Sequence, residues 1–141
     1  MDDVPAIAPL FAEYREFYGK AHGDSVRCEV FLRERIERNQ SVILVARSGG
    51  VAAGFAQMYP TFTSVGLARV WHLNDLYVGP ELRRCGIGKA LTLACIAFAR
   101  QDGAARLTLE TQETNASARA LYERLGMTLG TEFVKYAIRF D

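Results

Sequence analysis

The stretch that decides the fold is Val78-Gly-Pro-Glu-Leu-Arg-Arg-Cys-Gly-Ile-Gly-Lys-Ala90, which joins an expected strand to an expected helix. Backbone N–H groups at the start of a helix have no partner within the helix, and the helix dipole adds partial positive charge there. Gly86 and Gly88 remove side chains that would keep an anion away. Positive charge is added by Arg83, Arg84 and Lys89. The stretch therefore predicts a binding loop for a diphosphate group.

Two other kinds of phosphate-binding loop fit this stretch less well. A Walker loop needs glycine at position 83 and Ser or Thr at position 90, where this chain has Arg83 and Ala90. A dinucleotide fingerprint needs a third glycine at position 91, which is Leu91, and its first glycine directly after the strand. Glu110 does stand where a ribose-binding acid would be, so a dinucleotide-binding fragment stays open as an alternative.

Outward from this loop, apolar periodicity and turn residues predict the other elements. Helices are expected over 10–19, 24–39, 88–102 and 115–125, and strands over 41–46, 51–59, 67–78, 106–111 and 133–140. Ser48-Gly49-Gly50 predicts a hairpin between the first two strands, and Pro60 is expected to end the second. Antiparallel strands followed by a strand–helix–strand crossover predict an α/β domain with a mixed, mostly antiparallel sheet flanked by helices. The length of 141 residues predicts a single domain over 1–141.

Two motifs carry a resemblance to a known family. Arg83-x-x-Gly86-x-Gly88 matches the acetyl-CoA loop pattern Arg/Gln-x-x-Gly-x-Gly/Ala. After the next strand comes Asn115-Ala-Ser-Ala118-Arg-Ala-Leu121-Tyr122-Glu-Arg-Leu-Gly126-Met127, which departs from the pattern Asn-x-x-Ala-x-x-Leu-Tyr-x-x-x-Gly-Phe only at Met127. With both motifs in this order, residues 41–140 resemble the GNAT superfamily of acetyl-CoA-dependent N-acetyltransferases. Many members begin with a strand before the first helix, and that first strand is expected to be absent here.

The resemblance implies a cofactor site and a reaction. The co-substrate is acetyl-CoA, and the acetyl group passes directly to a primary amine. The family's fourth strand, here 67–78, splays from the fifth, here 106–111, and leaves backbone groups free to bond the pantetheine arm. Tyr122 takes the role of the acid that protonates the departing thiolate. The residues expected to contact the cofactor are Leu76, Val78, Arg83, Arg84, Gly86, Ile87, Gly88, Lys89, Asn115 and Tyr122.

The strand that enters the loop indicates the acceptor. Leu73-Asn-Asp-Leu-Tyr-Val78 is similar to the Leu-Glu-Asp-x-x-Val run of polyamine and small-amine acetyltransferases. It implies a small amine, such as a polyamine or an amino acid, held at the catalytic site by Asp75 with help from Glu110 or Glu113. Neighbouring strand positions are expected to put Asn74 and Asp75 on opposite faces, and Asp75 alternatively anchors a neighbouring loop. An amide at position 74 cannot accept the amine proton, so no general base is identified.

Two other functions stay open at this stage. The acceptor is alternatively a protein N-terminus or a lysine side chain, and the chain is alternatively a non-catalytic CoA-binding module of the same fold. Tyr59 and Trp71 either line an acceptor pocket or pack in the core, and His72 is expected to be a satisfied, partly buried histidine. Cys85 is expected to be an exposed loop thiol, and the charges over 29–38 a solvated helix face.

Composition narrows the partners and the compartment. With 17 Lys and Arg against 16 Asp and Glu, the chain lacks the strong positive field that nucleic acids and anionic membranes need. No apolar run approaches the roughly 20 residues of a membrane span, and the acidic start Met1-Asp2-Asp3 is unlike a signal peptide. Three scattered cysteines predict reduced thiols in the cytoplasm, and two histidines without nearby cysteines predict no metal site. An unpaired edge at 41–46 predicts a homodimer.

Overall fold

The computed structural model describes residues 2–20 and 24–140. It divides into two compact units, residues 1–110 and 111–141, and each is described by itself. The helices of the first unit are α1 (Val4–Phe17), α2 (Ser25–Glu37), a short 3₁₀ helix (Pro80–Leu82) and α3 (Ile87–Gln101). Its strands are β1 (Val42–Ser48), β2 (Val51–Thr63), β3 (Ala68–Val78) and β4 (Arg106–Leu109). The second unit contributes α4 (Ala116–Arg124).

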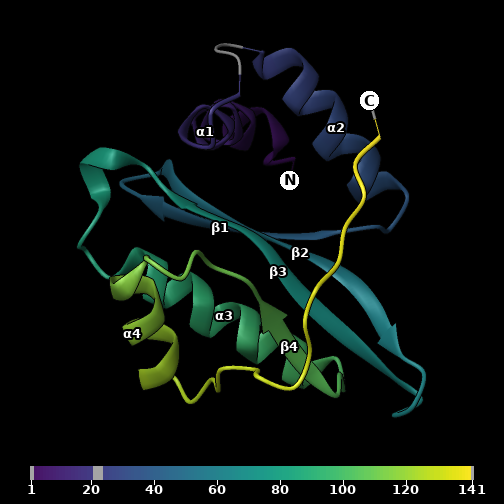
Figure 1. Ribbon diagram of the computed structural model, residues 1–141. Coiled ribbons are helices and arrows are strands. Elements are labelled where there is room, and N and C mark those ends of the chain that lie inside the picture. Colours follow the sequence, from purple (N-terminus) through teal and green to yellow (C-terminus); the bar gives the residue numbers. More distant parts are fainter. Residues whose placement is uncertain (1, 21–23, 141) are drawn as a thin grey trace. The chain divides into compact units, whose positions relative to one another are not determined.

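The first unit has three layers built on one sheet. The strands lie in the order β1-β2-β3-β4. The pairs β1–β2 and β2–β3 are antiparallel, whereas β3 and β4, joined through α3, are parallel. Figure 1 shows α1 and α2 on one face of the sheet and α3 on the other. This confirms the predicted mixed, mostly antiparallel α/β sheet, and within the described residues no strand precedes α1.

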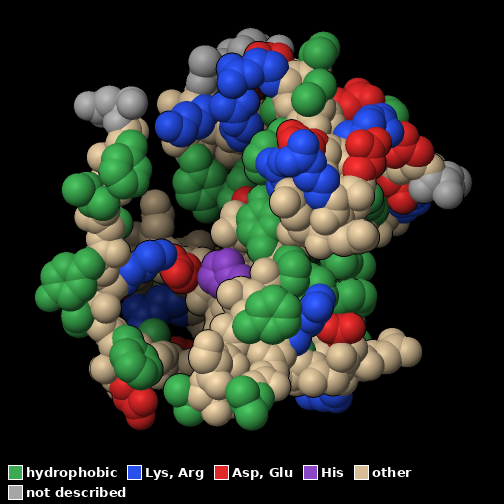
Figure 2. Space-filling view, turned by 90° about the vertical axis from the view of Figure 1, so that its right-hand side faces the viewer, with side chains coloured by type: hydrophobic (Ala, Val, Ile, Leu, Met, Phe, Trp, Pro, Cys, Tyr) green, Lys and Arg blue, Asp and Glu red, His purple; other side chains and the backbone are tan. Residues whose placement is uncertain are grey.

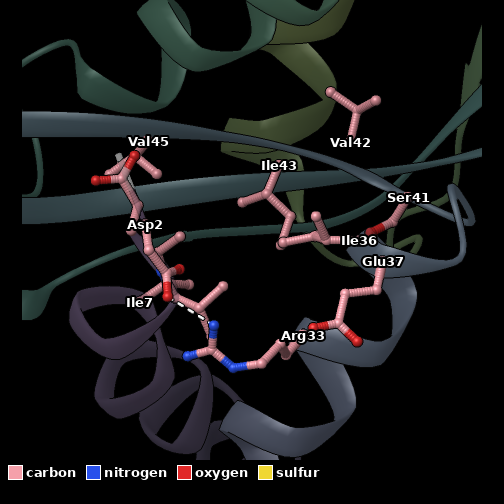
Figure 3. A pocket seen from close by; sticks show the side chains of 11 residues that line it. Asp2, Ile7, Arg33, Ile36, Glu37, Ser41, Val42, Ile43 and Val45 are labelled. Carbon is pink, nitrogen blue, oxygen red and sulfur yellow. Dashed lines mark hydrogen bonds and ion pairs between the residues drawn. The ribbon is translucent and has the colours of Figure 1, made fainter.

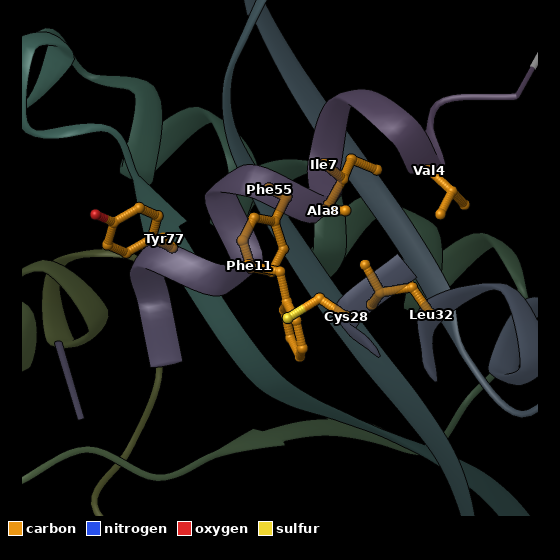
Figure 4. Close-up of a cluster of buried hydrophobic side chains, with 8 residues drawn as sticks. All are labelled: Val4, Ile7, Ala8, Phe11, Cys28, Leu32, Phe55 and Tyr77. Atoms are coloured by element: carbon orange, nitrogen blue, oxygen red, sulfur yellow. The ribbon is translucent and has the colours of Figure 1, made fainter. Parts of the chain in front are cut away.

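Each face of the sheet has its own hydrophobic core, because successive strand residues point to opposite faces. Under α1 and α2, the core consists of Val4, Ile7, Ala8, Phe11, Cys28, Leu32, Phe55 and Tyr77, and Figure 4 shows these side chains converging from the two helices and the sheet. Under α3, it consists of Ala56, Met58, Trp71, Leu73, Leu91, Cys95 and Ala99. Phe55 and Ala56 are neighbours on β2, and their side chains pack in different cores.

Local sequence explains where the helices begin. α1 starts at Val4, six residues before the expected start, with proline in its first turn, where a missing N–H removes no helical hydrogen bond. Asp24 caps α2, as expected, and accepts a hydrogen bond from the Arg27 N–H over 3.0 Å. The charges on α2 form ion pairs one turn apart, such as Arg33–Glu29 and Arg38–Glu34, on a solvated helix face as expected.

The expectation that Pro60 ends the second strand is wrong. β2 continues to Thr63, and Pro60 pairs with Trp71 of β3. Pairing between β1 and β2 extends only to Val42 and Met58. Beyond Met58 one edge of β2 has no neighbouring strand in the described sheet, so a residue without an N–H costs no hydrogen bond on that side.

The expectation of a strand over 133–140 is also wrong. Residues 127–140 of the second unit form no helix and no strand. The alternating apolar residues of this segment, such as Val134, Tyr136 and Ile138, are typical of a strand with one buried face. A strand also needs a paired neighbour, and no pairing in the described sheet involves this segment.

Candidate active site

A β-bulge in β3 gives the site its shape. Along β2, Gln57 and Met58 are consecutive, but their partners on β3 are Asp75 and Leu73, so Asn74 is an extra residue. Because of this extra residue, the side chains before and after the bulge alternate between the two faces of the sheet in opposite phase. Trp71 and Leu73 belong to the core under α3, and after the bulge Leu76 and Val78 pack against that core. Asp75 and Tyr77 consequently point to the face that carries α1 and α2.

The bulge coincides with the end of pairing between β3 and β4. The parallel pairs run from Val70 with Arg106 to Leu73 with Leu109. At the end of β3, the Gly79 N–H donates to the Ala53 carbonyl of β2 over 2.8 Å. Backbone direction alternates along a strand, so Leu76 and Val78 point their N–H and C=O groups away from β2, toward the side that β4 has left. Within the described sheet, this edge of β3 has no strand partner after Leu73, at the place where the sequence predicts the pantetheine arm.

Gly54 is the residue that lets β2 and β3 approach closely at this end of the sheet. A Cβ atom at Gly54 would lie 2.7 Å from the Tyr77 carbonyl oxygen, closer than such atoms approach. Glycine at position 54 is therefore needed for β2 to pair closely with the last residues of β3.

The loop after β3 has the backbone of an anion-binding helix start. Gly86, directly before α3, has φ +79°, and Arg84 also lies in the left-handed region at φ +65°. The first intrahelical bond runs from the Ala90 N–H to the Gly86 carbonyl over 2.9 Å. The N–H groups of residues 87–89 consequently have no partner within α3 and retain their capacity to bind an anion. The sequence prediction of a loop and helix start is confirmed, with the helix beginning at Ile87.

Arg83 lies over the end of β3. Its Nε donates to the Val78 carbonyl over 3.1 Å, and its guanidinium stacks over the rings of Tyr77 and Phe17 at 5.4 and 5.9 Å from their centroids. Arg83 thus connects the strand edge to the loop, so that a cation lies beside both parts of the expected cofactor site.

Asp75 lies at the centre of a buried polar group. It is 5% exposed, and Gln57, its partner on β2, is fully buried. The Gln57 Nε2 donates to Asp75 Oδ2 over 2.8 Å, and the Asn74 Nδ2 donates to Asp75 Oδ1 over 3.1 Å. The expectation that Asn74 and Asp75 point to opposite faces is therefore wrong, because the bulge breaks the alternation at that point.

Two tyrosines complete this group. Burial, followed by the charge of Asp75 and a hydrogen bond to it, raises the pKa of Tyr14 far above its ordinary value. Burial and the charge of Asp75 likewise raise the pKa of Tyr59 to about 12. Both hydroxyls stay protonated at neutral pH, and the Tyr14 hydroxyl donates to the carboxylate. We call Tyr14, Gln57, Tyr59 and Asp75 the Asp75 cluster.

Sequence reasoning missed Gln57 and Tyr14. The signal for Gln57 was its place between Ala56 and Met58, because an amide within an apolar strand must be buried or functional. Tyr14 was indistinguishable from the other apolar residues of the α1 stripe. Tyr59 was considered as a pocket residue, and the structure places it next to the charge of Asp75.

Three further residues in the first unit have structural contacts. The Trp71 Nε1 donates to Asp102 Oδ2 over 2.8 Å, and the indole packs on the Phe98 ring, so the expectation of a core aromatic holds for Trp71. His72 Nδ1 lies 2.8 Å from Thr108 Oγ1, as expected for a satisfied histidine. Cys85 is exposed, as expected.

In the second unit, the spacing of the second motif has a local explanation. Asn115 is the N-cap of α4, and its Oδ1 accepts from the Ala118 N–H over 3.3 Å. Gly126 ends the helix with φ +90°. Tyr122 lies two turns after the cap and is half-buried. The motif thus fixes where Tyr122 stands on α4.

A separate cavity of about 400 Å³ lies at the edge strand β1. Figure 3 shows its lining, which comes from the start of α1, the end of α2 and β1. Its polar residues include Arg33, paired with Asp2 over 2.6 Å, and Ser41, whose buried Oγ has no partner. None of the expected site residues lines it.

The described residues show two further general features. No helix among them is long and apolar enough to cross a bilayer, and they contain no group of three or more metal-ligating side chains. On the face shown in Figure 2, acidic and basic side chains are interspersed over the helical part at the top of the view.

The comparisons with known proteins agree with this geometry. Residues 7–127 match the model of the Acetyltransferase (GNAT) family. The chain belongs to this family. It is 48% identical, over 96% of its length and 91% of the relative, to the uncharacterized N-acetyltransferase YhfO of Bacillus subtilis (strain 168). It is 28% identical to the aminoglycoside N(6')-acetyltransferase type 1 of Klebsiella aerogenes, over 91% of this chain and 92% of the relative.

Solved structures support the same assignment. The crystal structure of a probable acetyltransferase superimposes with a TM-score of 0.91 at 36% identity, covering 99% of this chain and 93% of the other. This GNAT protein is therefore an N-acetyltransferase, a family that uses acetyl-CoA as its co-substrate. The mixed sheet, with α1 and α2 on one face and α3 on the other, is this chain's version of the family fold.

Proposed function

We propose that this GNAT protein transfers the acetyl group of acetyl-CoA to a primary nitrogen of a small cationic amine. The observation that carries the proposal is the edge of β3 at Leu76 and Val78, which β4 does not pair. This edge leads directly into a loop whose helix start presents N–H groups without a partner in the helix. An extended thioester arm fits the first feature and a diphosphate fits the second.

The cofactor contacts follow from this placement. The backbone groups of Leu76 and Val78 bond the pantetheine arm as an additional strand would. The N–H groups of Ile87, Gly88 and Lys89 bind the diphosphate, with glycine at 86 and 88 leaving room for it. Arg83 and Arg84 add charge, and Arg83 exchanges the Val78 carbonyl for a phosphate oxygen. Asn115 and Tyr122 of the second unit complete the proposed contact set.

The reaction needs a neutral amine and a stabilised oxyanion. An alkyl amine has a pKa near 10.4, so roughly one molecule in a thousand is neutral at pH 7. As the nitrogen attacks, a C–N bond forms, and the thioester oxygen becomes anionic beside the Val78 N–H. The C–S bond then breaks, and Tyr122 donates its proton to the departing thiolate. The proton of the attacking nitrogen leaves to water.

The acceptor class rests on charge. Asp75 is a buried carboxylate that forms no ion pair with any described residue, and a cationic acceptor would supply the missing charge. The Klebsiella relative is named for an aminoglycoside, which is a small molecule with several amino groups. Glu110, the residue after β4 in the same unit, is proposed to assist, as is Glu113 of the second unit.

A thiol-release assay with acetyl-CoA and a panel of acceptors tests the proposal. The panel contains polyamines, amino acids, an aminoglycoside and short peptides, and turnover is expected with the small amines. Turnover of peptides alone would contradict the acceptor class and leave the acetyltransferase standing. CoA binding without any turnover would indicate a non-catalytic module.

We also propose a homodimer in the cytoplasm. β1 is an edge of the described sheet, and Val42–Ala46 carries no charge that would discourage pairing with another strand. Buried free thiols at Cys28 and Cys95 suit a reducing compartment. Light scattering at micromolar concentration is expected to give twice the chain mass, and a monomer would contradict the dimer.

A further inference from the structure

We propose that the Asp75 cluster recognises a second cationic nitrogen of the acceptor, remote from the nitrogen that is acetylated, so that the enzyme selects diamines over monoamines. This inference rests on the proposed function and names the feature of the substrate that the site selects. The argument starts from the hydrogen bonds of the cluster.

The cluster contains one buried acceptor atom without a donor and one buried carboxylate without a counter-ion among the described residues. Asp75 receives hydrogen bonds from Gln57 and Asn74, and Tyr14 also bonds to it. The other amide atom of Gln57, Oε1, is fully buried and has no partner in the described structure. A buried acceptor without a donor is costly, and a carboxylate without a counter-ion more so. A group that brings both N–H donors and positive charge satisfies both atoms at once, and an ammonium group is the simplest such group.

No ion pair between described residues supplies Asp75 with a positive charge. Among these residues, the ion pairs join arginines to other carboxylates, and none involves Asp75. Arg35 is the cation whose charge reaches Tyr59. Its guanidinium is already bonded to Glu34 over 3.1 Å and to Gln40 over 2.8 Å, and it stacks on Phe31.

The position of the cluster separates it from the reacting atoms. Val78 lies three residues along the strand from Asp75, which is about 10 Å along the backbone. Their side chains serve opposite faces, since Val78 packs on the α3 side whereas Gln57 and Asp75 lie on the α1 side. A carboxylate that bound the reacting ammonium would also raise its pKa and oppose its deprotonation. The nitrogen held at Asp75 is therefore the one that does not react.

Aromatic rings border the cluster on the α1 side. The Tyr14 ring lies edge-on to Tyr18, 5.1 Å between centroids, and Tyr18 in turn contacts Phe17. Phe17 and Tyr18 are both largely exposed. Exposed ring faces attract organic cations and cover alkyl chains, so this border suits the carbon chain of a diamine.

The test compares 1,5-diaminopentane with pentylamine, which share a carbon chain and differ by one amino group. For the wild-type enzyme, kcat/KM is expected to favour the diamine at least about ten-fold, well above the about two-fold expected from its two equivalent nitrogens. A ratio of about two or less in the wild type overturns the inference, while turnover of both amines leaves the proposed function intact. Absence of turnover with every amine overturns the proposed function itself.

Variants locate the effect. Gln57→Met keeps the side-chain length but removes both amide groups, and it is expected to bring the ratio down to about two by raising KM for the diamine, with KM for acetyl-CoA and for pentylamine unchanged. Ser41→Ala is the matched control, because Ser41 also carries a buried oxygen without a partner but lies at β1. A stability loss in Gln57→Met with an unchanged ratio would show that the cluster only anchors α1 to the sheet. If Gln57→Met does not fold, Tyr59→Phe, which loses one hydroxyl of the cluster, is measured in its place.

Discussion

The two halves of β3, residues 70–73 and 75–78, have different surroundings, although three of the four residues in each half are apolar or aromatic. Residues 70–73 are paired with β2 on one edge and with β4 on the other, and their large side chains lie in the core under α3. Among the described strands, residues 75–78 are paired with β2 alone, and on their second edge the Val78 carbonyl accepts from Arg83. The change occurs at one extra residue, Asn74.

The difference teaches how a sheet provides a binding edge without losing its core. Before the bulge, backbone groups are used for pairing and side chains for packing, so this half contributes stability. After it, the backbone groups on one edge are available to a substrate, and an inward side chain is the carboxylate of Asp75. Substitutions in the first half should therefore affect folding, and those in the second half and its loop should affect binding. The following predictions test that division.

The largest effect is expected outside the strand. Residues 75–78 are proposed to bind the thioester and not to donate the proton that the departing thiolate needs. We assign that proton to the Tyr122 hydroxyl. Tyr122→Phe removes only the hydroxyl, so kcat should fall by about 10²–10⁴-fold with little change in acetyl-CoA affinity. Steady-state kinetics with a pre-steady-state check that chemistry limits turnover measure this. An unchanged kcat would rule out the role.

The first half of β3 is tested by Trp71→Ala. The indole is 4% exposed and packs on Phe98, so its removal should lower the free energy of unfolding by about 3–5 kcal/mol. CoA affinity of the folded protein should not change. Urea unfolding and calorimetry measure the two quantities. Trp71→Phe is the control, because it keeps an aromatic ring and loses the hydrogen bond to Asp102. If Trp71→Phe lowers the free energy of unfolding as much as Trp71→Ala does, the hydrogen bond and not the packing accounts for the loss.

The loop after the second half is tested by Gly86→Asp. An aspartate here puts negative charge beside the proposed diphosphate, so CoA affinity should fall by at least about 100-fold. Gly103→Asp is a matched control, since Gly103 has φ +77° against +79° at Gly86 and neither position has an atom within 4 Å of a new Cβ. Both variants carry the same backbone strain. Equal CoA affinity in the two would refute the loop assignment.

The second half of the strand itself is tested by Asp75→Asn. Loss of the carboxylate charge should raise KM for the acceptor amine by about ten-fold to 100-fold and leave KM for acetyl-CoA nearly unchanged. Initial rates with each substrate varied in turn separate the two. The reverse pattern would mean that Asp75 supports the cofactor strand.

The smallest effect concerns the proton of Tyr59. Burial first and the charge of Asp75 second raise its pKa to about 12. The unfolded tyrosine titrates near pH 10, so the contribution of Tyr59 to stability is complete below pH 10 and is lost as the pH rises to about 12. Asp75→Asn removes the second cause and leaves burial, so the pKa should fall but remain above 10. The pKa of Tyr59 is measured by pH titration of the difference in ultraviolet absorbance between each protein and its Tyr59→Phe counterpart. An unchanged pKa in Asp75→Asn would show that the charge of Asp75 does not act on Tyr59.

The sequence by itself determined the features that depend on neighbours along the chain. Glycine spacing and cations identified the loop at 83–89, because a helix start and its charges are local properties. Periodicity located the four α-helices and the four strands that pair but not the 3₁₀ helix at Pro80–Leu82, and two motifs indicated the family. Asn115 and Gly126 are recognisable as helix ends for the same local reason.

Only the tertiary structure decided the features that depend on a partner strand. The bulge at Asn74 exists because β2 lacks a residue opposite it, and it placed the amide of Asn74 on Asp75 against the expected alternation. Residues 133–140 have the pattern of a strand but no neighbour to pair with. Gln57 and Tyr14 join Asp75 from β2 and α1, far away in the sequence. Hydrogen bonding between distant segments, which no local pattern encodes, turned an ordinary apolar strand into a candidate recognition site.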